Sequence, residues 1–303
     1  MLIIFCCGLR PFAQRIMLAN NILKNNQVLS YFILTFIISW GGILCIIGPN
    51  GLPAASEEDK QAIGLGLLLG PSMAAFILMA VLEGRAGFRG LLLPRSININ
   101  LRQIGGSTCY YAIALLVAPL SSVVTLIMLS TFVSEAYTPK LFTSTNKPSL
   151  VLTGISVGLI IATFEEVGWS GYAVPRLLQT HGVLYTGVIT GVIWGLWHFP
   201  PFWEVDTFSS QIPLLILFGR LFTWIIAYRV IMVWIYSRMK RSGALMMMIL
   251  MHTSLVFCMI AIEPPLQGSD LLMYILSWTV VLWLVVWLGA SCCKSDCSHV
   301  KGQ

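Results

Sequence analysis

The stretch that decides the fold is residues 150–178, LVLTGISVGLIIATFEEVGWSGYAVPRLL, a long and mostly apolar run in the middle of the chain. It exceeds the roughly 20 apolar residues that an α-helix needs to cross a bilayer. Similar stretches precede and follow it, and together they predict about eight transmembrane spans. The expected spans are 30–48, 63–82, 109–133, 150–178, 182–199, 213–236, 243–263 and 271–290.

The composition excludes an ordinary soluble protein. The 303 residues are 57% hydrophobic and only 10% charged, whereas a soluble globular chain carries about 25% charged residues. The mean hydropathy is +0.85, so the chain has too little polar surface to cover a water-soluble fold. The sequence therefore predicts an all-α protein, a polytopic transmembrane helix bundle with the lipid bilayer as a main partner.

The basic residues are distributed unevenly between the two ends of the expected spans. If the N-terminus lies inside, the outer loops carry only Lys60, Lys140 and Lys147. The positive-inside rule then predicts both termini in the cytosol and an even number of spans, as in a bacterial plasma membrane protein. The net charge of +6 is dispersed over several inner loops, so no nucleic-acid partner is expected.

The expected spans form one domain. Residues 1–29 are predicted to be a cytosolic lead-in, residues 30–290 a single transmembrane domain, and residues 291–303 a cytosolic tail. The tail holds three cysteines whose spacing matches no standard zinc motif, so reduced thiols beside the membrane are expected there.

Several ionisable side chains fall inside the expected spans, where a charge costs at least ~2.5–3.5 kcal/mol. They are Glu165, Glu166, His198, Arg220, Arg229 and His252. Residues of this kind indicate a functional site by default. The two arginines are expected to pair with other groups of the bundle or to extend toward the interface, and neither is given a chemical role.

A helical hairpin that turns near residues 181–182 would bring the acidic and imidazole groups together. Glu165 lies about 16 residues before that turn and His198 about 16 residues after it, so both lie about 24 Å from it. His252 lies about ten residues into its own span from the same side. We therefore expect the two glutamates and two histidines to converge in one layer, and Gly191–Gly195 to permit close helix contact.

Two structural alternatives remain open at this stage. The glutamate pair can instead mark the cytosolic end of a shorter span, with both carboxylates among the lipid headgroups. Each histidine can serve only as a hydrogen-bonding residue between helices, as Ser or Thr does.

Carboxylates and imidazoles grouped inside a bundle favour hydrolytic chemistry. A glutamate can act as the general base that activates water, while the imidazoles orient that water or bind a developing oxyanion. Alternatively, Glu165, His198 and His252 can hold a divalent metal such as zinc, because two histidines and a carboxylate form a hydrolytic metal site. Either arrangement supports cleavage of a peptide bond within the membrane. The sequence contains no His-Glu-x-x-His motif, which disfavours an ordinary zinc protease.

Three segments that carry these residues resemble the signature motifs of a known family. They are FEEVGWSGY at residues 164–172, WGLWHFP at residues 194–200 and LMHTS at residues 250–254. In order and spacing they are similar to the motifs of the CPBP family, intramembrane endopeptidases that include the type II CAAX prenyl endopeptidases. The resemblance covers about residues 150–256.

The resemblance implies a role for each residue of the expected site. Glu165 would be the catalytic glutamate that activates water, and Glu166 its supporting neighbour. His198 and His252 would position the water and stabilise the transition state. The partner would be a peptide or protein substrate at the membrane.

The chain departs from the family pattern at three positions. The first motif usually reads Glu-Glu-x-x-x-Arg, and Ser170 stands here at the arginine position. The third motif usually carries Asn four residues after its histidine, and Val256 stands there. The second motif often has Phe four residues before its histidine, where this chain has Trp194.

The leading functional hypothesis is an intramembrane endopeptidase of the CPBP type with a glutamate-activated water. Because of the departures, the alternative is a catalytically impaired family member that acts as a membrane scaffold or regulator. A proton-coupled transporter with the glutamates as a relay ranks third, since no broken helices in matched halves are evident.

Overall fold

The structure of the chain, a computed structural model, describes most of the expected transmembrane domain. The described residues are 23–48, 56–85, 87, 104–132, 137–203, 212–239 and 241–300. Residues 1–22 of the expected lead-in and residues 301–303 of the expected tail lie outside them. Within the described residues the secondary structure is helical and no strand occurs, so the predicted all-α class is confirmed.

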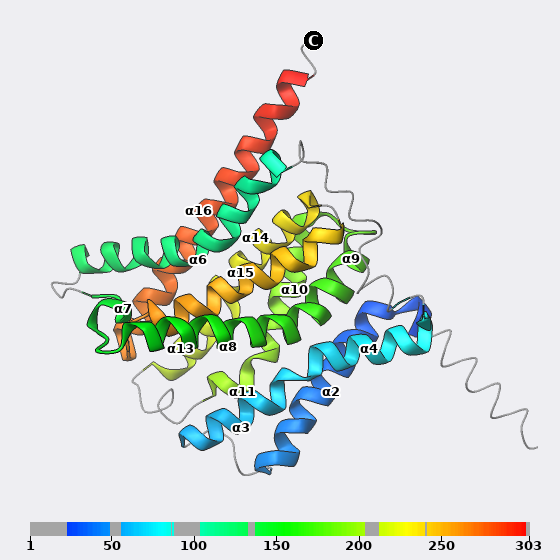
Figure 1. Cartoon of the computed structure of the whole chain (residues 1–303), viewed down its shortest axis with the longest axis horizontal. Coiled ribbons are helices and arrows are strands. Elements are labelled where there is room, and N and C mark those ends of the chain that lie inside the picture. Colours follow the sequence, from blue (N-terminus) through cyan, green and yellow to red (C-terminus); the bar gives the residue numbers. More distant parts are fainter. Residues whose placement is uncertain are drawn as a thin grey trace, which may run out of the picture.

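Figure 1 shows how the described helices are arranged in space. In chain order they are α2 Gln27–Ile47, α3 Glu57–Leu68, α4 Gly70–Leu82, α6 Ile104–Phe132, α7 Lys140–Thr143, α8 Lys147–Gly168, a π-helical turn Trp169–Ala173, α9 Val174–Leu177, α10 Val183–Trp197, α11 Phe199–Phe202, α13 Pro213–Phe222, α14 Trp224–Arg238, α15 Arg241–Ala261 and α16 Gly268–Val300.

Seven helical segments among the described residues are long and apolar enough to cross a membrane. They are Gln27–Ile47, Glu58–Leu82, Cys109–Thr131, Lys147–Leu177, Pro213–Arg238, Gly243–Ala261 and Gly268–Ser291. The chain is therefore an integral, multi-pass membrane protein.

The remaining expected span, 182–199, differs from the others in length. It corresponds to α10, which has 15 residues and ends at Trp197. Pro200 and Pro201 follow directly, and neither can donate the backbone hydrogen bond that would continue the helix. The last helix is longer than expected, because α16 continues past residue 290 to Val300.

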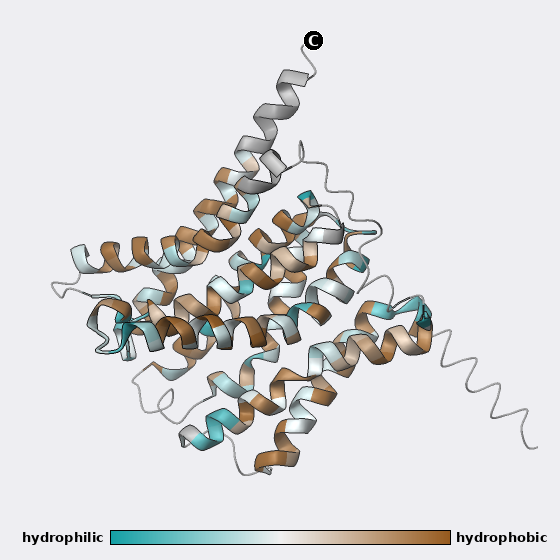
Figure 2. Ribbon diagram, viewed as in Figure 1, coloured by the Kyte–Doolittle hydropathy of each residue, from teal (hydrophilic) through white to brown (hydrophobic). Residues whose placement is uncertain are grey.

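The outer faces of the helices carry large apolar side chains, as contact with lipid requires. Leu152, Leu214 and Trp287 are each more than half exposed. Hydrophobic residues extend along most of the helices, while hydrophilic ones gather at places such as the start of α3 and the region of α7 (Figure 2). A soluble protein rarely exposes apolar patches of this extent.

Polar contacts connect helix ends that the charge distribution assigns to the same side of the membrane. Arg176 after the π-helical turn donates to Gln27 at the start of α2 and pairs with Glu83 after α4. At the opposite ends, the backbone N–H of Lys140 donates to the carbonyl oxygen of Ile262 at 3.1 Å. The helices thus alternate in direction as the sequence predicts.

Glycines let α10 pack directly against the backbone of its neighbours. A Cβ added at Gly195 would lie 1.8 Å from the carbonyl oxygen of Leu221, and one added at Gly191 would lie 2.9 Å from the Cα of Ile226. The close helix contact expected at Gly191–Gly195 is therefore confirmed. On the other side, Gly158 of α8 packs as closely against α15.

The close contact of α10 makes a testable prediction for stability. Gly195→Ala should lower the midpoint of thermal unfolding, because overpacking a tight contact costs about 1–3 kcal/mol or more. Gly41→Ala is the matched control, since nothing lies within 4 Å of its added Cβ and alanine favours a helix over glycine by about 1 kcal/mol. The measurement is thermal unfolding of both variants in detergent micelles. Equal midpoints would contradict the packing described here.

Candidate active site

The two adjacent glutamates lie on the last turn of α8, just before the helix changes its geometry. The π-helical turn Trp169–Ala173 follows, and Pro175 lies within the first turn of α9. Proline cannot donate the hydrogen bond that an uninterrupted α-helix requires, so the regular geometry is not continued through this segment. Successive residues of a helix point about 100° apart. Glu165 and Glu166 therefore face different neighbours.

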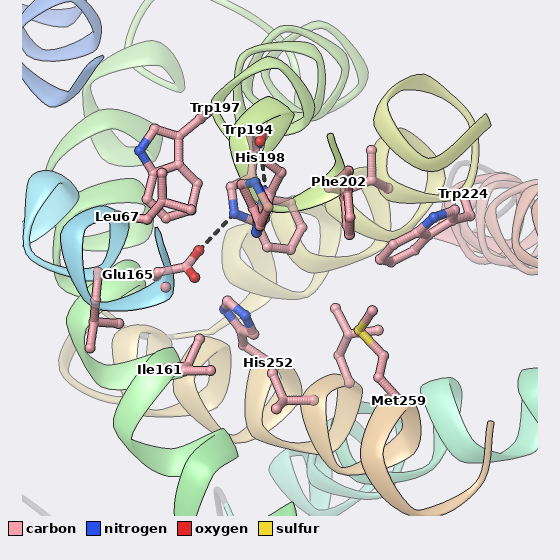
Figure 3. A pocket seen from close by; sticks show the side chains of 16 residues that line it. Leu67, Ile161, Glu165, Trp194, Trp197, His198, Phe202, Trp224, His252 and Met259 are labelled. Carbon is pink, nitrogen blue, oxygen red and sulfur yellow. Dashed lines mark hydrogen bonds between the residues drawn. The ribbon is translucent and has the colours of Figure 1, made fainter. Parts of the chain in front are cut away.

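A cavity of about 230 Å³ lies between α8, α10 and α15. Glu165, His198 and His252 all line it, together with mainly apolar side chains. Figure 3 shows these three residues around one opening, with Glu165 facing the two imidazole rings from the side. The structure thus brings together three of the four residues that the sequence predicts for the site. Glu166, the fourth, lies behind the cavity wall and contacts His252 there.

Glu165 is buried, with 3% of its surface exposed, and is held at one oxygen. The indole Nε1–H of Trp194 donates a hydrogen bond of 2.8 Å to its Oε2. A phenylalanine at this position could not donate this bond. The tryptophan that departs from the family pattern therefore supplies an extra contact to the glutamate.

Glu166 is surrounded by donors from three elements. Arg229 on α14 places its Nη1 3.0 Å from both carboxylate oxygens, and both side chains are 0% exposed. The Nδ1 atom of His252 lies 3.0 Å from Oε1. The hydroxyl of Ser170 donates to Oε2. Glu166 is thus fully engaged in the protein interior and does not face the cavity.

The hydrogen bonds of the two histidines define which nitrogen of each ring is left for a water molecule or a substrate in the cavity. In His198, Nδ1 lies 2.9 Å from the carbonyl oxygen of Trp194, which can only accept, so this nitrogen carries the proton. In His252, Nδ1 faces the carboxylate of Glu166, which is paired with Arg229 and likewise accepts. Both rings therefore leave Nε2 for a water molecule or a substrate.

Aromatic rings hold the two imidazoles in place. Trp194 meets His252 edge to face with centroids 5.2 Å apart, and Trp197 meets His198 in the same way at 4.8 Å. Phe202 stacks on His198 at 5.6 Å. The indole of Trp197 is in turn anchored, because its Nε1–H donates to Ser39 of α2 at 2.9 Å. These three aromatic residues also line the cavity.

A structural or catalytic zinc ion would need at least three of these side chains around one point. Among the described residues, no group of three His, Cys, Asp or Glu side chains lies close enough together to hold one. As placed, Glu165, His198 and His252 do not fit a three-ligand zinc site, and metal binding by them stays a prediction.

Arg229 is the residue of this cluster that sequence reasoning did not assign. The sequence identifies it as an intramembrane charge but gives no means of choosing its partner. The available signal is a balance of charges: two adjacent buried carboxylates require a cation. Arg220 and Arg229 lie in the interior of an expected span, whereas Arg176 lies near the end of its span. The structure pairs Arg229 with Glu166.

Fold and site together define a class of protein: a multi-pass membrane helix bundle with a buried glutamate and two histidines around an apolar cavity. Residues 147–258 match the family model described as "Type II CAAX prenyl endopeptidase Rce1-like". This segment contains all four predicted site residues. Residues 147–258, a little over a third of the chain, are therefore similar to the CAAX protease (CPBP) family.

A curated relative agrees with this family. The chain is 24% identical over 186 residues to "CAAX prenyl protease 2" of Methanococcus maripaludis. The similar region makes up 60% of this chain and 65% of the relative. The chain thus matches a little under two thirds of the length of that protein.

The two adjacent glutamates should differ sharply in their effect on stability. Glu166→Gln leaves Arg229 as a buried charge without its carboxylate, which should cost on the order of 3 kcal/mol. Glu165→Gln is the matched control, because it removes a carboxylate with a single neutral donor and should cost about 1 kcal/mol. Chemical unfolding of both variants in the same detergent measures the difference. A Glu165→Gln variant as unstable as Glu166→Gln would contradict the assignment of the ion pair.

Proposed function

We propose that this chain is an intramembrane endopeptidase that hydrolyses a peptide bond with a water molecule activated by Glu165. The observation that carries the proposal is the shared cavity: Glu165, His198 and His252 line one hollow inside a membrane-spanning bundle. The match of residues 147–258 to a protease family supports the same reaction class.

In the proposed reaction Glu165 acts first as a base and then as an acid. Its carboxylate takes a proton from water while the water oxygen bonds to the carbonyl carbon of the scissile peptide. The tetrahedral intermediate then collapses, the C–N bond breaks, and Glu165 returns the proton to the leaving nitrogen. The products are a carboxylic acid and an amine, so no proton is gained or lost overall.

The hydrogen bonds of the site suit these steps. Trp194 binds Oε2 of Glu165 and leaves Oε1 for the water. One hydrogen of that water is directed at Oε1 of Glu165, and the other is donated to the Nε2 atom of one of the two histidines, which orients the water. A histidine that enters the reaction already protonated donates its Nε2–H to the negatively charged oxygen of the intermediate and keeps that proton. Glu166 fixes the ring of His252 from behind.

The proposed substrate is a peptide or protein at the membrane. The apolar lining of the cavity, with residues such as Leu67, Leu255 and Met259, favours an apolar segment over a charged one. Specificity for prenylated proteins that end in a CAAX motif rests on the family match and on the name of the archaeal relative. We include such proteins in the proposed substrate class on that basis.

The proposed orientation places both termini in the cytosol. It rests on the uneven distribution of basic residues and on the contacts that join Arg176, Gln27 and Glu83 at one end of the bundle. A bacterial plasma membrane is the location that the sequence favours, and it stays a prediction.

One observation supports the alternative of a catalytically impaired relative acting as scaffold or regulator. Val256 lines the cavity beside the imidazole of His252, at the position where the family motif has Asn. Valine offers no donor to an oxyanion, and loss of such a donor typically costs about 10²–10³ in rate. Under this alternative the same cavity binds a membrane peptide without cleaving it efficiently.

Removal of the proposed base should abolish cleavage without unfolding the protein. Glu165→Gln should lower kcat by about 10²–10⁴-fold, and His198→Ala and His252→Ala should each lower it as well. His181→Ala is the matched control, because this exposed histidine lies at the turn outside the cavity. The assay uses purified protein in liposomes with a farnesylated CAAX peptide and its unprenylated form, and mass spectrometry detects products. Cleavage that survives Glu165→Gln unchanged would refute the proposed mechanism.

Restoring the family donor should increase activity. Val256→Asn should raise kcat by roughly 10-fold or more, because an amide N–H₂ would then face the cavity beside His252. Val256→Ala controls for the change in side-chain size. If only Val256→Asn cleaves the peptides, the natural chain is the impaired relative. A Val256→Asn rate no higher than that of Val256→Ala would argue against any role for position 256.

A further inference from the structure

The glutamate pair of the first motif has a buried cation beside it, although position 170 of the motif is not an arginine. Ser170 stands four residues after Glu166, at the position where the family pattern has Arg. The guanidinium of Arg229 lies at that place instead, although it comes from α14 and is distant in sequence. Its Nη1 atom is 3.0 Å from both oxygens of Glu166, and its Nη2 atom is 3.3 Å from the hydroxyl of Ser170.

We infer that Arg229 is a positioning residue that supplies, from a different helix, the cation that the motif lacks at position 170. This inference rests on the proposed function. Arg229 does not line the cavity, so it acts on the reaction only through the residues it contacts.

Ser170 and Arg229 form a matched pair. The hydroxyl of Ser170 donates to Glu166 and accepts from Arg229, so the short side chain completes a closed set of hydrogen bonds. It also leaves the volume that the guanidinium occupies. A second arginine at position 170 would place two cations beside one carboxylate and make them repel each other.

The neighbouring helix is shaped to admit the arginine. A Cβ added at Gly191 of α10 would lie 3.2 Å from the Cβ of Arg229, which is closer than most such contacts. Because glycine has no side chain, this position leaves space beside α10 for the side chain of Arg229, which extends to Glu166. The guanidinium then lies over the indole ring of Trp194, 5.4 Å from its centroid.

Through these contacts Arg229 connects to the proposed catalytic residues Glu165 and His252. It binds Glu166, which holds Nδ1 of His252. It also lies over Trp194, whose indole binds Glu165. In addition it neutralises Glu166, and so removes the repulsion that an unpaired carboxylate would exert on Glu165. Loss of Arg229 should therefore displace both His252 and Glu165.

The decisive experiment moves the cation from one helix to the other. Arg229→Met should lower kcat by about 10²-fold with little change in KM, because a small misplacement of reacting groups costs about that much. Arg229→Lys should retain part of the activity. The double variant Ser170→Arg/Arg229→Ser should recover much of kcat, whereas Ser170→Arg alone should lower it. Arg238→Met, a substitution at the exposed end of the same helix, is the control and should leave kcat unchanged.

A second measurement does not depend on cleavage, so it can also be made on variants that are too unstable for the activity assay. The midpoints of thermal unfolding are compared for Glu166→Gln, Arg229→Met and the variant that combines these two substitutions. This variant should lose much less than the sum of the two single losses, because each single change leaves one buried group unpaired. Glu166→Gln combined with Arg238→Met should be additive.

The two proposals fail in different ways. The proposed function would be overturned if neither the natural chain nor the Val256→Asn variant cleaved either peptide. The comparison of unfolding midpoints would then still decide whether Arg229 is the partner of Glu166. A natural chain that cleaves while Arg229→Met retains full kcat would overturn the positioning role. Additive unfolding losses for Glu166→Gln and Arg229→Met would overturn the pairing itself.

Discussion

The structure depends on one ion pair buried in the middle of a membrane bundle. A carboxylate removed from water is stable as an anion only if a cation and further donors lie against it. Glu166 has Arg229, Ser170 and His252 as these partners. The pair joins α8 to α14, and the shared oxygen extends the contact to α15. The contacts of Glu166 therefore link three of the helices that line the cavity.

The fold could be predicted almost completely from the sequence, because lipid imposes a simple requirement on length and hydropathy. Seven expected spans appear as helical segments of sufficient length among the described residues. The shortening of α10 was not predicted, although Pro200 and Pro201 mark the point at which it ends. The extension of α16 to Val300 was also missed, because a helix can continue into polar sequence where the hydropathy signal stops.

The sequence allowed us to predict the level along the helices at which the site residues lie, but not the direction in which each side chain points. Counting residues from a turn places Glu165 and His198 at one level, and the cavity contains both of them together with His252. The same count cannot tell which way a side chain points around its helix. For this reason it could not separate Glu165, which faces the cavity, from Glu166, which faces Arg229. The hydrogen bond from Trp194 to Glu165 was missed for the same reason.

The pairing of Glu166 with Arg229 also affects how related chains are recognised. A short sequence pattern that demands an arginine at position 170 would reject this chain, although the family model matches residues 147–258. The positive charge is present, but it is contributed by a residue beyond the reach of any such pattern. Classification of remote members should therefore compare the charges gathered around the glutamates in space, and it should examine substitutions at positions 166, 170, 191 and 229 as one linked group.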